Sequence, residues 1–219
     1  EYDRYADNVG CTLTTVPPNI PTFQPDPAAL EKCVTEKTRA VLIDNPNNPT
    51  GVVYNEETIR AIAAVLAKKE QEYGHAIYLI SDEPYRELVF DGASVPWIPN
   101  DYKNTIVAYS FSKSLSLPGE RIGYVAVSPQ CGDAETMIQM CGQISRGIGH
   151  NCPPSIIQLA VAEVLDKTAD LKVYETNRDI LYKELINLGF TCVKPGGTFY
   201  IFPKALEEDA KEFSRKALK

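Results

Sequence analysis

The sequence is poor in the features that mark several classes of protein. It has no apolar run close to the ~20 residues that a membrane-spanning helix needs. Its two histidines, His75 and His150, lie far apart without the spacing of metal ligands, so we expect no metal site. Basic residues are also too few for a nucleic-acid-binding face, because 22 Lys and Arg stand against 29 Asp and Glu. From these absences we expect no nucleic-acid partner and no association with a membrane.

Cysteine usage indicates a reducing compartment. No two cysteines form a C-x-x-C pair, and no charged-then-apolar leader is found. Scattered cysteines in a chain of this length are typical of reduced cytoplasmic thiols, so we expect no disulfide and a cytoplasmic location. The cysteines are Cys11, Cys33, Cys131, Cys141, Cys152 and Cys192.

Four short runs rich in Val, Ile, Leu and Tyr predict buried strands at residues 40–43, 77–80, 105–108 and 124–127. Residues 55–73 predict an amphipathic helix between the first two, because Asn55 can cap it and its apolar residues recur at helical spacing. Strand, helix and strand in this order indicate a crossover unit. The sequence therefore predicts an α/β fold with three layers, a mostly parallel sheet flanked by helices.

The residues after Ser128 have a different pattern, with more helical segments. Helices are expected over 133–144, 153–165 and 172–188. Residues 190–193 and 199–202, separated by a Pro-Gly-Gly turn, predict two strands of a smaller sheet. We therefore expect a large domain over residues 1–167, incomplete at its N-terminus, and part of a small α+β domain over 168–219.

Polar residues directly follow three of the predicted strands. Because ligands bind outside the carboxyl ends of the strands in open α/β sheets, these residues are expected to meet in one crevice. Each motif alone is more typical of a turn, a solvated loop or a surface lysine than of a binding site. Together they match a ligand with a phosphate, a basic ring nitrogen and a carbonyl. The candidate residues are Asn48, Asp82, Tyr85, Ser110, Lys113 and Arg121.

Three sequence blocks carry a family resemblance. Asn45-Pro-Asn-Asn-Pro-Thr-Gly51, Asp82-Glu-Pro-Tyr85, and Ser110-Phe-Ser-Lys113 followed by Pro118-Gly-Glu-Arg-Ile-Gly-Tyr124 resemble the signature blocks of class I/II aminotransferases. These enzymes depend on pyridoxal 5′-phosphate (PLP) and have PLP fold type I. The resemblance covers most of the chain. It implies transfer of an amino group from an α-amino acid to a 2-oxo acid, by a protein that acts as a homodimer.

The resemblance also implies a role for each candidate residue. Lys113 is the catalytic residue, which forms the internal aldimine with the cofactor and later shuttles the substrate proton. Asp82 pairs with the pyridine nitrogen, while Asn48 and Tyr85 bond the phenolic oxygen. Ser110 and Arg121 hold the phosphate, for which the planar guanidinium is well suited.

The family pattern is incomplete in this chain. No ring that would stack on the pyridine is found before Asn48, and no convincing substrate-carboxylate arginine follows residues 199–202. We therefore expect a fragment that is inactive alone and leaves some apolar surface exposed. Two alternatives share the cofactor motifs. One is the aminotransferase-like ligand-binding domain of a transcription regulator, and the other is a PLP-dependent lyase or decarboxylase.

Overall fold

The computed structural model describes residues 2–219, and one four-stranded sheet forms its centre, in the order β1-β2-β3-β4. Strands β1 (Ala40–Asp44), β2 (Tyr78–Asp82) and β3 (Thr105–Ser110) run parallel, whereas β4 (Gly123–Val127) pairs antiparallel with β3. All four strands fall where the apolar runs predict them. The sheet is mostly parallel, as expected.

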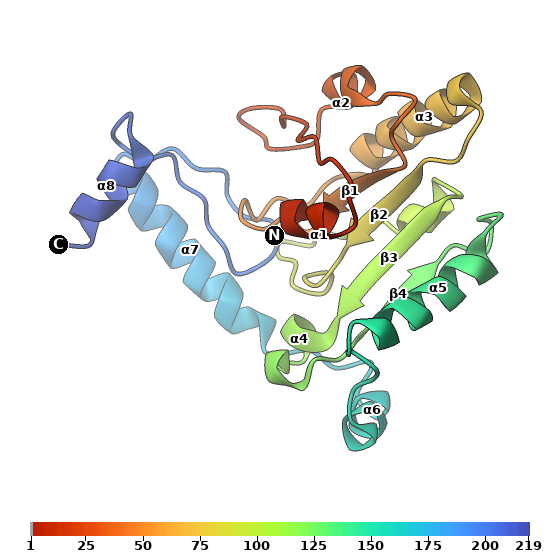
Figure 1. The fold of residues 1–219 in the computed structure, drawn as a ribbon. Helices are drawn as coiled ribbons and strands as arrows, with labels where there is room; N and C mark the ends of the chain where they lie inside the picture. Colours follow the sequence, from red (N-terminus) through yellow and green to blue (C-terminus); the bar gives the residue numbers. More distant parts are fainter. Residues whose placement is uncertain (1) are drawn as a thin grey trace.

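Helix α3 (Glu56–Tyr73) covers one face of the sheet (Figure 1). It begins where the side chain of Asn55 accepts a hydrogen bond from Thr58 N at 2.8 Å, and it ends at Gly74 in the left-handed conformation. Helix α2 (Pro27–Cys33) packs beside it. The main core lies between these helices and the strands, where Ile59, Leu66 and Leu79 are fully buried.

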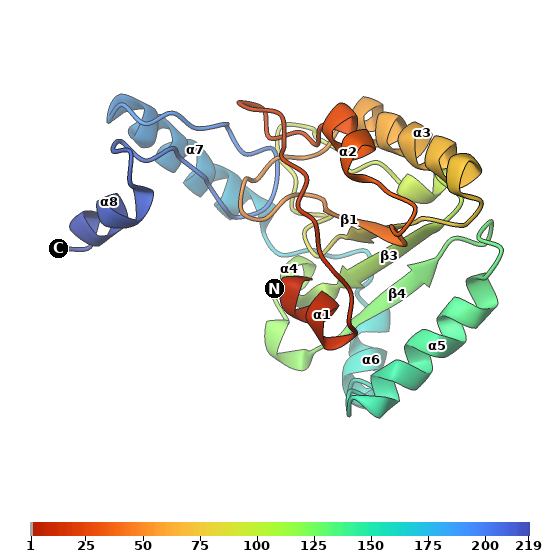
Figure 2. The same ribbon diagram turned by 45° about the horizontal axis from the view of Figure 1, so that its top comes forward.

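Helix α5 (Ala134–Gly147) lies on the opposite face, which completes the predicted three layers (Figure 2). No residue of α5 is buried, and apolar side chains such as Ile144 are exposed on it. Further exposed apolar side chains lie on α6 (Ser155–Ala162), so the expected apolar surface is present. The prediction that all four strands are buried is wrong for β1 and β4. These are the two edge strands of the sheet, and within residues 2–219 no further strand pairs with either.

Helices α7 (Leu171–Asn187) and α8 (Ala210–Ala217) lie to one side of the sheet (Figure 1). The side chain of Arg178, 5% exposed, joins α7 to the rest of the molecule by donating to Pro195 O at 3.1 Å and by pairing with Asp91. The two small-sheet strands predicted over 190–202 do not form. Only one bridge, Thr191 with Lys204, links these segments, and two isolated strands are marginal without neighbours.

The remaining elements are short. Helix α1 (Tyr2–Asn8) opens the described chain, and α4 (Phe111–Ser114) follows β3 directly. The 3₁₀ turns are η1 (Ile98–Asn100) and η2 (Pro118–Glu120). Within residues 2–219, no helix has both the length and the apolar character needed to cross a membrane. The division into domains at residue 167 stays a prediction.

Candidate active site

The carboxyl ends of β1, β2 and β3 meet at one edge of the sheet. Asp44 at the end of β1 stands opposite Asp82 at the end of β2, and Asp82 stands opposite Ala108 of β3. Ser110 lies two positions beyond Ala108 and ends β3. The polar residues that follow these strands therefore share one edge, because the three strands are parallel.

Lys113 lies in the short helix α4, immediately after β3 (Figure 1). Ser110 caps this helix: its hydroxyl accepts from Ser112 N at 3.1 Å and donates to the Ser112 hydroxyl at 2.6 Å. The Lys113 Nζ atom lies 5.9 Å from the centroid of the Tyr85 ring and 5.5 Å from that of Phe199. Both rings attract a cation, so they favour a defined position for the amine.

Tyr85 lies in the turn after β2 and is 3% exposed. Burial raises the pKa of its phenol, and the hydrogen bond with Tyr200 and the charges of Asp44 and Asp82 raise it further. The phenol therefore keeps its proton at neutral pH, so it can donate a hydrogen bond. Its hydroxyl lies 3.0 Å from the hydroxyl of Tyr200.

Asp82 receives a hydrogen bond from a distant part of the chain. The Tyr2 hydroxyl in α1 donates to Asp82 Oδ2 at 2.7 Å. A donor of this kind stabilises the ionised carboxylate and fixes its orientation. Sequence reasoning missed Tyr2, because a tyrosine 80 positions away and outside any motif carries no signal of this contact.

Asp44 is a second carboxyl at this edge, beside Asp82. Its Oδ2 atom accepts a hydrogen bond from Asn48 N at 2.9 Å, whereas its buried Oδ1 atom has no hydrogen-bond partner among residues 2–219. The pKa of Asp44 is raised to about 7, mainly by burial. The hydrogen bond from Asn48 N lowers this pKa, and the negative charge of Asp82 raises it. The bond ties the predicted residue Asn48 to the end of β1, while the Asn48 side chain is exposed. Only the strand-end position of Asp44 could have identified it from the sequence.

Arg121 reaches the same edge because β4 is antiparallel. Gly123 at the start of β4 stands opposite Ser110 at the end of β3, and Phe111 N donates to Ile122 O at 3.1 Å. Arg121 is exposed and lies just before this pair, with φ of 53°. Its guanidinium donates to Pro118 O at 2.8 Å. The backbone thus places Arg121 at the end of the β3–β4 pair where Ser110 lies, which is compatible with a shared anion site.

Gly51 ends the Asn-Pro-Asn-Asn-Pro-Thr-Gly block in a close contact with a later segment. Its carbonyl oxygen accepts from Gly196 N at 2.9 Å and from Gly197 N at 3.0 Å. A Cβ atom on Gly51 would lie 2.6 Å from Pro195 Cβ, and its φ of +71° also favours glycine. The motif therefore does more than turn the chain, because it holds residues 195–197 against the site.

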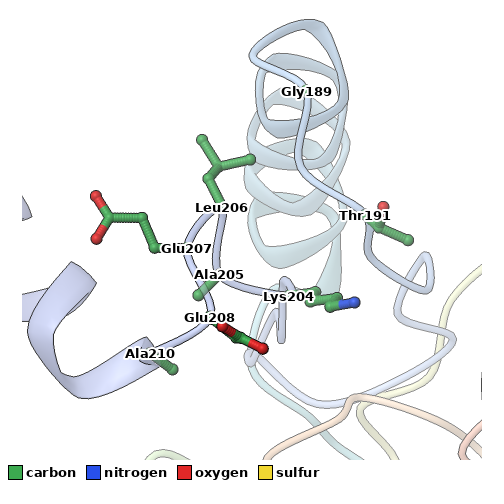
Figure 3. Close-up of a pocket in the computed structure, with 8 residues that line it drawn as sticks. All are labelled: Gly189, Thr191, Lys204, Ala205, Leu206, Glu207, Glu208 and Ala210. Atoms are coloured by element: carbon green, nitrogen blue, oxygen red, sulfur yellow. The ribbon is translucent and has the colours of Figure 1, made fainter.

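Two pockets in the described part of the chain lie away from this edge. Figure 3 shows one of about 490 Å³ between the end of α7 and the start of α8, lined by residues that include Thr191, Lys204 and Glu208. Another, of about 590 Å³, includes Glu70 and Asn104 near the amino ends of the strands. Neither contains a predicted site residue, so the strand-end arrangement identifies the candidate site and the hollows do not.

Comparison with other proteins gives a consistent result. The family model for aminotransferase class I and II matches residues 1–219. An aspartate aminotransferase of Bacillus subtilis is 34% identical over 213 residues, which cover 90% of this chain and 51% of that protein. Aromatic-amino-acid aminotransferase 2 of Thermococcus litoralis is 31% identical over 220 residues, 93% of this chain and 53% of that protein. The chain spans about half the length of the curated relatives it matches.

Solved structures match over nearly the whole chain. An amino transferase from Eubacterium rectale superposes with a TM-score of 0.96 at 45% identity, covering 99% of this chain and 55% of that one. An aspartate aminotransferase from Thermus thermophilus with maleate gives a TM-score of 0.82 at 26% identity, covering 99% and 56%. The strand-end motifs, the sheet and these matches agree: the chain belongs to the class I and II aminotransferase family.

Proposed function

We propose that the protein carrying this chain is a PLP-dependent aminotransferase that moves an amino group from an α-amino acid to a 2-oxo acid. The observation that carries this proposal is the position of Lys113, which lies at the carboxyl edge of the sheet with its amine next to Tyr85. The names of the relatives favour an enzyme over a regulator's ligand-binding domain.

The residues at this edge suit each part of PLP. Asp82 offers a carboxylate for the ring nitrogen, and Tyr85 offers a buried hydroxyl for the phenolic oxygen. Ser110 ends β3 opposite Gly123, and Arg121 lies two residues before Gly123, so both lie at the same end of this strand pair, which supports a shared phosphate site. The backbone N–H of Asn48 bonds Asp44 at the end of β1, and we propose the side-chain amide of Asn48 as a second partner of the phenolic oxygen. The donor set therefore fits the cofactor that this family uses.

When bound, PLP supplies a carbonyl that condenses with an amine and a ring that accepts the electron pair of the substrate Cα–H bond. The Lys113 amine would hold the cofactor through its carbonyl, and the same amine, when free, would take and return the proton at the substrate Cα. The Asp82 carboxylate keeps a proton on the ring nitrogen, because an adjacent negative charge favours the protonated form. Tyr85 donates to the phenolic oxygen and remains neutral.

The wider organisation is proposed on the same basis. We propose a large domain over residues 1–167 and part of a small domain over 168–219, in a homodimer located in the cytoplasm. The separate position of α7 and α8 in Figure 1 supports the division. The dimer rests on the family, and the compartment rests on the scattered cysteines.

The test is covalent fixation of the cofactor in the whole protein. Borohydride added with PLP should attach the cofactor to Lys113, as located by peptide mass spectrometry. Lys113→Ala should lose fixation and slow transamination at least about a hundredfold, the scale of a lost acid–base group. Lys103→Ala is the matched control, because Lys103 is exposed and pairs with Glu70. Fixation to another lysine, or near-normal turnover in Lys113→Ala, contradicts the proposal.

A further inference from the structure

Residues 195–200 form a bridge between the two loops that carry the site. On one side, Gly51 O accepts from the amides of Gly196 and Gly197. On the other side, Thr198 N donates to Leu88 O at 2.8 Å and Phe90 N donates to Gly196 O at 2.9 Å. The fit is close, since a Cβ atom on Gly197 would lie 2.8 Å from Leu88 O. The backbone of this segment is therefore fixed relative to both loops.

This anchoring brings the Tyr200 hydroxyl to the Tyr85 hydroxyl, at 3.0 Å. The two rings pack edge to face with centroids 5.7 Å apart, so the contact is held by packing as well as by the hydrogen bond. Tyr200 N donates to the Thr198 hydroxyl at 3.0 Å, which fixes the backbone beside it. The neighbouring Phe199 ring faces Lys113, so the same segment contacts two candidate site residues.

The Tyr85 and Tyr200 hydroxyls can each donate one proton to a hydrogen bond and can each accept one. If Tyr85 donates its proton to a ligand oxygen, its own oxygen is left to accept the proton of Tyr200. A donated hydrogen bond also polarises the Tyr85 O–H group and strengthens its bond to the ligand. Without Tyr200, the buried Tyr85 hydroxyl could rotate away from the ligand.

We propose that Tyr200 is a positioning residue, which donates to Tyr85 and thereby directs the Tyr85 proton to the phenolic oxygen of the cofactor. The proposal deepens the proposed function and rests on it, because it needs PLP attached at Lys113. A purely structural role for Tyr200 would affect folding stability and would leave the chemistry of the bound cofactor unchanged.

The test is the absorption of the bound cofactor as a function of pH, in the whole protein. The absorption changes when the nitrogen joining Lys113 to the cofactor loses its proton. A hydrogen bond donated to the phenolic oxygen stabilises the form in which this nitrogen has lost its proton. Tyr200→Phe should therefore raise the pH at the midpoint of the absorption change by about half a unit, which is roughly threefold in the proton dissociation constant. Tyr85→Phe should raise it further, and the double variant should match Tyr85→Phe alone.

Tyr174→Phe is the matched control, because the Tyr174 ring packs against Phe199 in the same aromatic cluster, with centroids 5.9 Å apart. Its midpoint should equal that of the unmodified protein. Fixation of the cofactor to Lys113 with an unchanged midpoint in Tyr200→Phe overturns this inference alone. Additive shifts of Tyr85→Phe and Tyr200→Phe also overturn it, since the two residues would then act independently. Failure of the unmodified protein to fix PLP overturns the proposed function together with this inference.

Discussion

Replacing Asp44 with Asn should change the pH dependence of stability. Asp44 is a partly buried carboxyl whose Oδ1 atom is shielded from water, and its pKa is raised from 3.8 to about 7, first by burial and then by the charge of Asp82. Asn has nearly the same shape and keeps an oxygen that can accept the Asn48 N–H. The substitution therefore removes the titration with little change in packing.

The direction and the size of the expected change in stability follow from the linkage between protonation of Asp44 and folding. Unfolded Asp44 ionises near pH 4, whereas folded Asp44 ionises near pH 7, so the folded state binds the extra proton between these values. The stability that Asp44 contributes is complete below about pH 4 and is lost as the pH rises to about 7. At about 1.4 kcal/mol per pKa unit, the loss amounts to at most about 4 kcal/mol. Water penetration reduces this, so a gain of about 1–3 kcal/mol for Asp44→Asn above pH 7 is expected.

Guanidinium unfolding of the cofactor-free whole protein at several pH values measures this effect. The midpoint of Asp44→Asn should match that of the unmodified protein near pH 4 and exceed it increasingly toward pH 8. Asp166→Asn is the control, because it makes the same substitution at a side chain that is 72% exposed. A constant difference between Asp44→Asn and the unmodified protein would refute the argument from burial.

Two further predictions concern contacts at the edge of the site. Gly51→Ala should lower the free energy of unfolding by about 2–3 kcal/mol, because the new Cβ would meet Pro195 at 2.6 Å. Gly74→Ala, at the same φ of +71° but with nothing within 4 Å, should cost only about 1 kcal/mol, and equal losses would show that the clash is unimportant. Tyr2→Phe removes the donor to Asp82 and should weaken PLP binding about tenfold in a fluorescence titration of cofactor-free protein, whereas unchanged affinity would exclude a role for this bond.

Local signals in the sequence were sufficient for most of the sheet. The apolar runs place all four strands, and the cap at Asn55 together with Gly74 sets the ends of α3. The parallel strand ends do meet at one edge, as the strand-end rule requires, and the assignment of the six candidate residues to one site stays a prediction. These successes share one cause, since each depends on residues that are neighbours along the chain.

The failures all depend on contacts between distant segments. Burial of β1 and β4 requires neighbouring strands, which apolar runs alone cannot reveal. The smaller sheet over 190–202 was predicted from two short apolar runs on either side of a Pro-Gly-Gly turn, yet backbone groups of residues 196–198 bond to the loops at Gly51 and Leu88. The contacts of Tyr2 and Tyr200 join residues 80 and 115 positions apart, and no local pattern encodes them.

The reversed direction of β4 has a consequence for which insertions the protein should tolerate. A parallel fourth strand would need a crossover back to the opposite edge of the sheet before it could begin, and Arg121 would then enter from that far edge. The antiparallel strand instead returns from Ser110 to Gly123 through α4 and η2, and this connection contains both Lys113 and Arg121. Added residues between Lys113 and Arg121 should therefore move Arg121, the proposed phosphate-binding residue, away from the Lys113 amine. The loop at Gly74, at the opposite edge, should accept additions with little effect on the chemistry.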